Sequence, residues 1–200
     1  ERTVRISAGP WTSAFLARHI GRIWTVADRF GLEFVTGNQK VDIGRRNADI
    51  GIRNQRPTEQ WLAARLLGRV AYGLYSGRDL VNGVEAGYFV CVAGQNNQTH
   101  STRWMDARYC DRIAVRGNDP MSVCELVANG AGLSIFPSFV GDSDPRLVRI
   151  APVIKELETE QWLVCHHEER HVPAVRIVTD RIAGLMRDHA ALFRGEKPIP

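Results

Sequence analysis

The sequence predicts an α/β protein of two Rossmann-like lobes joined by two crossover strands. Short apolar strands alternate with amphipathic helices, and this alternation starts again after residue 76. Such alternation is typical of mainly parallel sheets, so one sheet of this kind is expected in each lobe. A chain of 200 residues suits one large domain or two small lobes, and the restart favours two. The first lobe is expected at residues 1–76 and 161–200, and the second at 77–160.

The first lobe is expected to open with a strand and a helix. Val4 and Ile6 alternate with polar residues, which indicates a strand over residues 3–8. Apolar residues then recur at spacings of three and four, which predicts an amphipathic helix that Gly31 ends. Thr12 and Ser13 stand where the N-cap of this helix is expected. The apolar stripe consists of Leu16, Ile20, Ile23, Ala27 and Phe30.

The remainder of the first lobe reads mainly as extended chain. Strands are predicted at residues 32–36 and 48–53, with 41–46 as a candidate short helix between them. Residues 66–76 form a longer extended segment that is rich in Val, Tyr and Leu.

The second lobe repeats the alternation, and the chain ends on a strand and a helix. Strands are predicted at residues 88–93, 113–116, 133–136 and 162–165. Asn118-Asp119-Pro120 is typical of a helix start, because Pro at the first helical position follows a polar cap. Gly130 is expected to end that helix, and a last amphipathic helix is expected over 175–192.

The composition is that of an ordinary globular protein, with 44% hydrophobic and 24% charged residues. The formal net charge is +4, but the basic residues are scattered, whereas a DNA-binding surface usually clusters them. No apolar run approaches the roughly 20 residues that span a bilayer, and residues 1–5 contain no signal-peptide core. These observations favour a cytoplasmic protein that contacts no membrane.

Four widely spaced cysteines are present, Cys91, Cys110, Cys124 and Cys165. They form no C-x-x-C pair and lie in or beside apolar stretches, which favours free thiols in a reducing cytosol. A redox pair of Cys110 and Cys124 is the alternative.

Motifs for catalysis or metal binding are not found. The chain has no G-x-S-x-G elbow, no phosphate-binding loop ending in Lys-Ser or Lys-Thr, and no G-x-G-x-x-G fingerprint. His167 and His171 have the spacing of a helical metal site, but Pro173 follows closely, so a solvated turn is the preferred interpretation. Neither a cofactor, a metal nor an enzymatic activity is therefore expected.

A series of short motifs runs in one order along nearly the whole chain. It includes Ala48-Asp49-Ile50-Gly51-Ile52-Arg53, Val127-Ala128-Asn129-Gly130-Ala131-Gly132-Leu133, Phe136-Pro137-Ser138-Phe139 and Pro173-Ala174-Val175-Arg176, with further segments at 5–8, 41–43, 62–68, 74–76 and 162–166. Each motif is weakly specific alone, but the ordered series resembles the effector-binding domain of the LysR-type transcriptional regulators, which has the type II periplasmic-binding-protein fold.

The resemblance implies a sensing domain whose lobes are regulatory subdomains I and II. A small-molecule effector would bind between them, and the domain would form a homodimer or a higher homo-oligomer. The helix over 16–30 of one protomer would pack against the helix over 122–129 of the other. The family contacts DNA through an N-terminal winged helix-turn-helix, which is expected to be absent because the chain begins where the sensing domain would begin.

Physical reasoning points to the same place for a ligand. In doubly wound sheets, ligands bind at the carboxyl ends of strands, where helix N-termini offer unpaired N–H groups to an anion. Residues 9–13 and 117–121 are two such places, facing across a cleft. The predicted ligand-binding residues are Pro10, Trp11, Thr12, Ser13, Arg53, Gly94, Gln95, Asn118, Met121, Phe136 and Trp162.

Several of these residues have two interpretations. Thr12 and Ser13 would bind a carboxylate or cap a helix, and Trp11 would stack on a ligand or pack between lobes. Arg53 would clamp a carboxylate or form a structural ion pair. Phe136 and Trp162 would close the apolar sides of the cleft or pack in the core. The ligand is accordingly expected to be a small anionic or aromatic metabolite.

Two other functions use the same cleft. A solute-binding protein of a transporter would need export, and therefore a signal peptide in the full gene product. A small α/β transferase or lyase would turn over its ligand, with activity lost on replacing Arg53 or Ser13.

Overall fold

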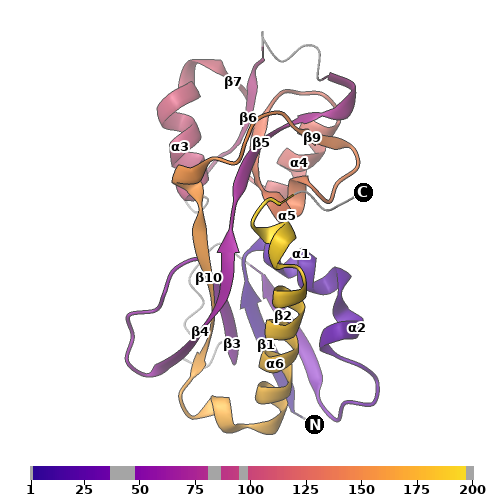
Figure 1. Ribbon diagram of the computed structural model, residues 1–200, viewed down its shortest axis with the longest axis vertical. Coiled ribbons are helices and arrows are strands. Elements are labelled where there is room, and N and C mark those ends of the chain that lie inside the picture. The colour runs from indigo at the N-terminus through magenta and orange to yellow at the C-terminus, as the bar shows by residue number, and fades with distance from the viewer. Residues whose placement is uncertain (1, 37–47, 81–86, 95–98, 197–200) are drawn as a thin grey trace. The chain divides into compact units, whose positions relative to one another are not determined.

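The computed structural model describes residues 2–36, 48–80, 87–94 and 99–196. The chain forms two compact units, hereafter the first and the second unit. The first unit comprises Glu1–Arg69 and Thr159–Ala190, and the second comprises Val70–Glu158 and Ala191–Pro200 (Figure 1). No helix among the described residues is both long enough and apolar enough to cross a membrane.

Two stretches that the expected boundaries placed in the first lobe belong to the second unit. Residues 70–76 contain most of β5 (Tyr72–Gly77), which pairs with two strands of the second unit. Residues beyond 190 include Phe193, whose ring stacks on that of Phe139 with 4.1 Å between the centroids.

The sheet of the first unit has the strand order β2-β1-β3-β10-β4. Its strands are β1 (Thr3–Ala8), β2 (Gly31–Thr36), β3 (Ile50–Arg53), β4 (Leu62–Val70) and β10 (Thr159–His166). β1 is parallel to β2 and to β3, whereas β10 is antiparallel to β3. The expected parallel sheet is therefore present in the N-terminal half, and β10 adds an antiparallel strand to it.

The long helix expected after the first strand is wrong. The chain instead forms α1 (Pro10–Arg18) and the short α2 (Ile20–Ile23), followed by a turn. In this turn the Asp28 carboxylate accepts a hydrogen bond from the N–H of Thr25 at 2.8 Å. Asp28 also binds Arg181 through two hydrogen bonds of 2.7 and 3.0 Å. Local side-chain bonding thus outweighs the apolar stripe, although Ile23 and Phe30 are still buried.

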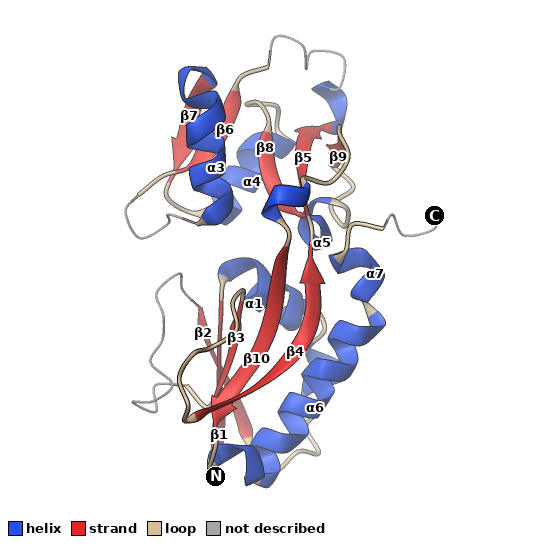
Figure 2. Ribbon diagram, turned by 60° about the vertical axis from the view of Figure 1, so that its left-hand side comes forward, coloured by secondary structure: helices blue, strands red, loops and turns tan. Residues whose placement is uncertain are grey.

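The last predicted helix is confirmed as α6 (Pro173–Asp188), followed by the short α7 (Ala190–Phe193). Figure 2 shows α6 running beside β4, and Arg65 of β4 forms an ion pair with Asp180 of α6. One face of α6 is buried against the unit, as its helical period predicts. The buried residues are Val175, Val178, Ile182, Ala183, Leu185 and Met186.

The second unit combines parallel and antiparallel pairs. Its strands are β5, β6 (Phe89–Val92), β7 (Ile113–Gly117), β8 (Ser134–Pro137) and β9 (Leu147–Arg149). β6 and β7 are parallel, but β8 and β9 flank β5 in antiparallel fashion. A parallel bridge between Phe89 and Leu133 links the two groups. The expectation of a mainly parallel sheet is therefore wrong for this unit.

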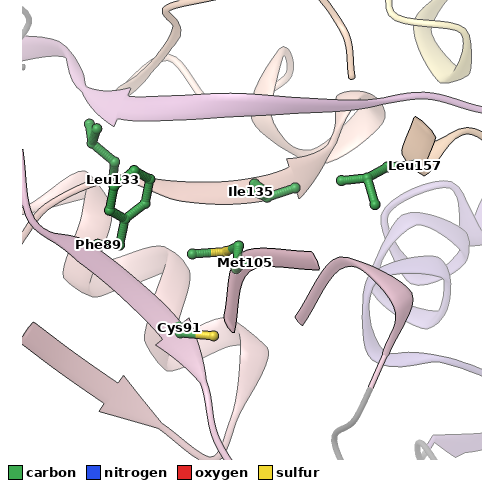
Figure 3. Packing of buried hydrophobic residues seen from close by; sticks show 6 residues of the cluster. All are labelled: Phe89, Cys91, Met105, Leu133, Ile135 and Leu157. Carbon is green, nitrogen blue, oxygen red and sulfur yellow. The ribbon is translucent and has the colours of Figure 1, made fainter. Parts of the chain in front are cut away.

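The second unit also contains a helix that the sequence did not suggest. α3 (His100–Tyr109) buries only Thr102 and Met105, so its sequence has no apolar stripe to reveal it. Met105 joins a cluster of apolar side chains drawn from several elements (Figure 3). The buried members are Phe89, Cys91, Met105, Leu133, Ile135 and Leu157. The candidate helix over 41–46 lies outside the described residues.

Candidate ligand-binding site

One edge of the first-unit sheet gathers three strand ends and a helix start. β1 and β3 are parallel, so the end of β1 at Ala8 and the end of β3 at Arg53 lie at the same edge. β10 is antiparallel to β3 with Trp162 opposite Arg53, which places the beginning of β10 at this edge as well. α1 begins at Pro10, directly after β1. The six residues predicted for the first lobe, Pro10, Trp11, Thr12, Ser13, Arg53 and Trp162, therefore belong to one edge.

The N-terminus of α1 has neither a side-chain cap nor an acidic residue. Gly9 is the N-cap, Pro10 is the first helical residue, and no side chain caps the helix. The first turn contains no acidic residue, so no negative charge there opposes a bound anion. The expectation that Thr12 or Ser13 is the N-cap is wrong. Proline fixes φ in the helical range without needing a partner for an N–H, and the helix therefore begins before the two hydroxyl residues.

Thr12 and Ser13 lie in the first turn of α1 and are 8% and 6% exposed. The hydroxyl of Ser13 donates to the carbonyl of Ala8 at 3.3 Å, and so ties the helix to the end of β1. The hydroxyl of Thr12 accepts a hydrogen bond from Nε2 of Gln161 at 3.1 Å. A hydroxyl that accepts can still donate its proton, so Thr12 is better suited than Ser13 to bind an acceptor group of a ligand.

Gln161 is a residue of this edge that the sequence analysis missed. It lies on β10 and is 3% exposed. Gln161 alternates with the buried Leu163 and Cys165, so its position on the buried face of the strand was readable. Gln161 could have been found in the sequence as a polar residue at a position where the alternation of the strand predicts a buried apolar one.

Aromatic and cationic groups complete the first-unit edge. Trp11, Arg53 and Trp162 are partly buried. Nε1 of Trp162 donates to the Glu160 carboxylate at 3.1 Å, and the guanidinium of Arg56 lies 5.4 Å from the Trp162 ring centroid. This edge thus combines hydrogen-bond donors with flat apolar surfaces, which suits a planar anion.

The second unit has a comparable edge where β6 and β7 end. Val92 lies opposite Gly117 in this parallel pair, so Gly94 and Asn118 follow strand ends at the same edge. Both are exposed, and Met121 is partly buried in the first turn of α4 (Pro120–Ala128). The helix start predicted at Asn118-Asp119-Pro120 is confirmed, with Asp119 as the N-cap. Gln95 lies outside the described residues.

The two helix starts differ in charge, although the sequence analysis treated them as equivalent. The Asp119 carboxylate accepts hydrogen bonds from the N–H and the hydroxyl of Ser122, at 2.8 and 2.9 Å. These bonds lower the pKa of the Asp119 carboxyl below its usual range. An ionised carboxylate thus already occupies the N-terminus of α4, which makes that terminus a poor place for an anion.

Phe136 is a core residue in its packing. It is 2% exposed and lies on β8, with its ring centroid 6.0 Å from that of Tyr75. This burial corresponds to the second of the two interpretations given for it, packing in the core.

All four cysteines are free thiols, of which Cys110 alone is exposed. Burial raises the pKa of the Cys91 and Cys165 thiols, so both are held in the protonated form. Across the ranges that the structure describes, no group of three or more His, Cys, Asp or Glu side chains could hold a metal ion.

Removing the α4 cap gives a pH-dependent loss of stability. We expect Asp119→Ala to destabilise the chain by about 1 kcal/mol at pH 7. Because folding lowers the pKa of this carboxyl, its contribution is complete above the unfolded pKa of about 4 and is lost as the pH falls through the folded pKa. Urea unfolding at pH 7 and at pH 3 should show the difference from wild type shrinking at acid pH.

Asp119→Asn is the matched control, because asparagine caps a helix well and does not titrate. It should stay close to wild type at pH 7. A deficit of Asp119→Ala that is the same at both pH values would contradict the role given to the charge.

The chain has a two-unit α/β fold of the type II periplasmic-binding-protein class. Residues 1–187 match the family model described as the LysR substrate binding domain. The chain belongs to this family, which is the effector-binding domain of LysR-type transcriptional regulators. The resemblance that the ordered motifs suggested is thereby confirmed.

Solved regulatory domains have the same fold at low sequence identity. The regulatory domain of CrgA, a LysR-type transcriptional regulator from Neisseria meningitidis, is similar with a TM-score of 0.73 and 13% identity, over 93% of this chain and 99% of that one. The CcmR regulatory domain of Synechocystis PCC6803, in complex with 2-PG, gives 0.72 and 10%, over 94% and 99%. The AmpR effector domain of Pseudomonas aeruginosa gives 0.68 and 13%, over 95% and 98%. No match was found among curated proteins.

These comparisons concern regulatory domains of transcription factors rather than enzymes. The match to the family model supports effector sensing as the class of function. At such identities the likeness of the solved structures speaks for the fold alone.

Proposed function

We propose that the chain senses a small anionic molecule, which binds at the edge of the first-unit sheet where α1 begins. The observation that carries this proposal is the pair of buried hydroxyls, Thr12 and Ser13, in the first turn of a helix without a side-chain cap. Buried polar groups at a helix N-terminus suit a carboxylate, phosphate or sulfate, because unpaired N–H groups and the helix dipole both favour negative charge.

Arg53 and the two tryptophans support a planar anion in particular. A guanidinium can bind a carboxylate through two parallel hydrogen bonds, and indole rings stack on flat apolar surfaces. Arg53 and Trp162 face each other across the β3–β10 pair, so both belong to the edge where α1 begins. An aromatic carboxylate such as benzoate is accordingly a suitable probe, with inorganic sulfate as a second, non-aromatic anion.

The second-unit residues have a weaker claim to the anion. Asp119 already places a carboxylate at the start of α4. We therefore keep Gly94, Asn118 and Met121 as predictions for the uncharged part of the ligand. Gln95 and Phe136 are kept at lower priority, Phe136 because its side chain is buried.

Replacing single groups at the first-unit edge tests the proposal. We expect Thr12→Val to weaken benzoate and sulfate binding roughly 10- to 150-fold, the value of one hydrogen bond to a charged ligand. Arg53→Ala should have an effect of similar size, and Ser13→Ala a smaller one, because that hydroxyl is bonded to Ala8. Isothermal titration calorimetry measures each affinity, with Asn118→Ala testing the second unit.

Thr58→Val is the matched control, since it makes the same exchange at an exposed threonine. It should bind both probes as wild type does. If Arg53→Ala and Ser13→Ala both leave the affinity unchanged, and Thr12→Val does too, the site is wrongly placed.

In the intact regulator we propose that ligand binding shifts the balance between two arrangements of a homodimer or larger homo-oligomer in the cytoplasm. A ligand can do this only through different affinities for the two arrangements. DNA would be contacted through a separate N-terminal domain. A monomeric mass at high protein concentration, with and without ligand, would count against the oligomer.

A further inference from the structure

The amide of Gln161 is buried, and its side-chain hydrogen bond within the described residues goes to Thr12, a candidate ligand-binding residue. Gln161 is 3% exposed on β10, and Nε2 donates to the Thr12 hydroxyl at 3.1 Å. Burying an amide is costly unless it is hydrogen-bonded, so this contact is favoured over an unpaired amide. The bond links β10 to the first turn of α1 through two residues that are 149 positions apart in sequence.

The direction of this bond determines what Thr12 can offer a ligand. A hydroxyl has one proton and two lone pairs, and Gln161 uses one of the lone pairs. The Ala8 carbonyl, four residues before Thr12, accepts from Ser13 instead. Among the described residues, no acceptor is found for the Thr12 proton. The hydroxyl is therefore set to donate to an incoming oxygen atom.

We propose that Gln161 is a positioning residue that selects the charge of the ligand. By donating to Thr12, its amide turns the Thr12 proton toward the ligand, so that the site accepts oxyanions and rejects ammonium groups. This inference rests on the proposed function, because it assumes that the ligand binds at the start of α1. It adds a residue that contacts the ligand only through Thr12.

An isosteric exchange reverses the bond. In Gln161→Glu at neutral pH, the introduced carboxylate can only accept, so the Thr12 proton turns toward it and the hydroxyl presents lone pairs to the ligand. We expect sulfate affinity to fall at least about 10-fold, and binding of benzylammonium to appear. When the introduced carboxyl is protonated at lower pH it can donate again, so sulfate affinity should recover. Wild type should show no such pH profile for sulfate.

Three variants separate this role from a structural one. Gln161→Met removes the bond without adding charge, and should weaken sulfate binding without gaining benzylammonium. In the double variant Thr12→Val/Gln161→Met, the loss should be close to that of Thr12→Val alone, since Gln161 acts through Thr12. Gln60→Glu makes the same exchange at an exposed position of the first unit and should bind sulfate as wild type does. Circular dichroism checks the folding of each variant. If Gln161→Glu does not fold, the comparison of Thr12→Val, Gln161→Met and their double variant tests the positioning role.

Calorimetry with sulfate, benzoate and benzylammonium gives distinguishable outcomes. Anion binding by wild type, its loss in Gln161→Glu and its recovery at lower pH support the inference. If wild type binds the anions and Gln161→Glu or Gln161→Met binds them equally well, Gln161 has no positioning role while the proposed function stands. Wild-type binding of benzylammonium instead of anions would mean that the amide is oriented the other way, which overturns the inference. If wild type binds none of the probes, the anion site and the inference both fall.

Discussion

Gly132→Ala is expected to destabilise the second unit by about 2 to 5 kcal/mol, through backbone strain and overpacking together. Gly132 has φ of +148°, a conformation that residues with a Cβ rarely adopt. A Cβ here would also lie 2.4 Å from the carbonyl oxygen of Tyr88. That oxygen accepts the N–H of Leu133 at 2.9 Å, in the bridge that links β6 to the β5–β8–β9 group. The clash would therefore disturb the bridge that joins β6 to the β5–β8–β9 group.

Gly184→Ala is the matched control for this exchange. Gly184 lies within α6, and the nearest atom to an added Cβ is the Arg187 guanidinium at 3.8 Å, an ordinary contact. Alanine should stabilise this helix by up to about 1 kcal/mol. Urea unfolding measures both, with hydrogen exchange of β6 and β8 locating the loss in Gly132→Ala. Equal stability of the two variants would contradict the packing described for Gly132.

Asp142→Ala is expected to cost about 3 kcal/mol, the lower end of the range for breaking a buried ion pair. Oδ1 of Asp142 accepts the Tyr75 hydroxyl at 2.9 Å and lies 3.5 Å from Nε of Arg149. The side chains of Asp142 and Arg149 are 7% and 10% exposed, so removal of the carboxylate leaves a nearly buried positive charge. Oδ2 is buried without a hydrogen-bond partner in the described part of the chain, which reduces the loss.

Asp188→Ala gives the comparison at the surface. Asp188 binds Arg22 at 2.7 Å, but both side chains are more than half exposed. Its removal should cost much less than removal of Asp142, because water screens an exposed ion pair. Thermal and urea unfolding rank the two variants, and tyrosine absorbance gives a second readout of Asp142. Burial, followed by the charge of Asp142, raises the pKa of Tyr75, so loss of the carboxylate should lower that pKa. A cost for Asp142→Ala no greater than that for Asp188→Ala would contradict the buried network.

Local sequence patterns predicted a strand or helix correctly where the signal lies within that element. The alternation of Val4 and Ile6 predicted β1, and the polar-Pro start at Asp119-Pro120 predicted α4, because both signals act within a few residues. Helical period predicted α6 for the same reason. The family was predicted from the order of the short motifs along the chain, and recognising that order requires no knowledge of side-chain packing.

The errors in the predicted secondary structure arose where contacts between residues far apart in sequence determine it. The stripe from Leu16 to Phe30 is apolar because α2 and the following turn both bury residues, and the turn is held by Arg181, more than 150 residues away. The antiparallel β5–β8 and β5–β9 pairs are tertiary contacts that alternation alone does not encode. Element order was therefore easier to predict than helix length or strand direction.

The six residues expected in the first lobe share one sheet edge, but the hydrogen bonds made there were not predicted. The sequence allows Thr12 and Ser13 either to cap a helix or to bind a ligand, and their place after Pro10 rules out the N-cap. Gln161 was missed because its role comes from a hydrogen bond to a residue at the other end of the chain. The two helix starts looked alike in sequence, yet Asp119 closes one of them with its own carboxylate.

Hydrogen exchange of the wild-type chain with and without benzoate tests the central proposal most directly. A ligand at the first-unit edge should slow exchange in the first turn of α1 and at the start of β10, with less change at the start of α4, where Asp119 is already bound to Ser122. The same titration on Thr12→Val should show the protection only at higher benzoate concentrations. Protection confined to residues outside this edge, or unchanged by Thr12→Val, would contradict an anion-sensing site at the start of α1.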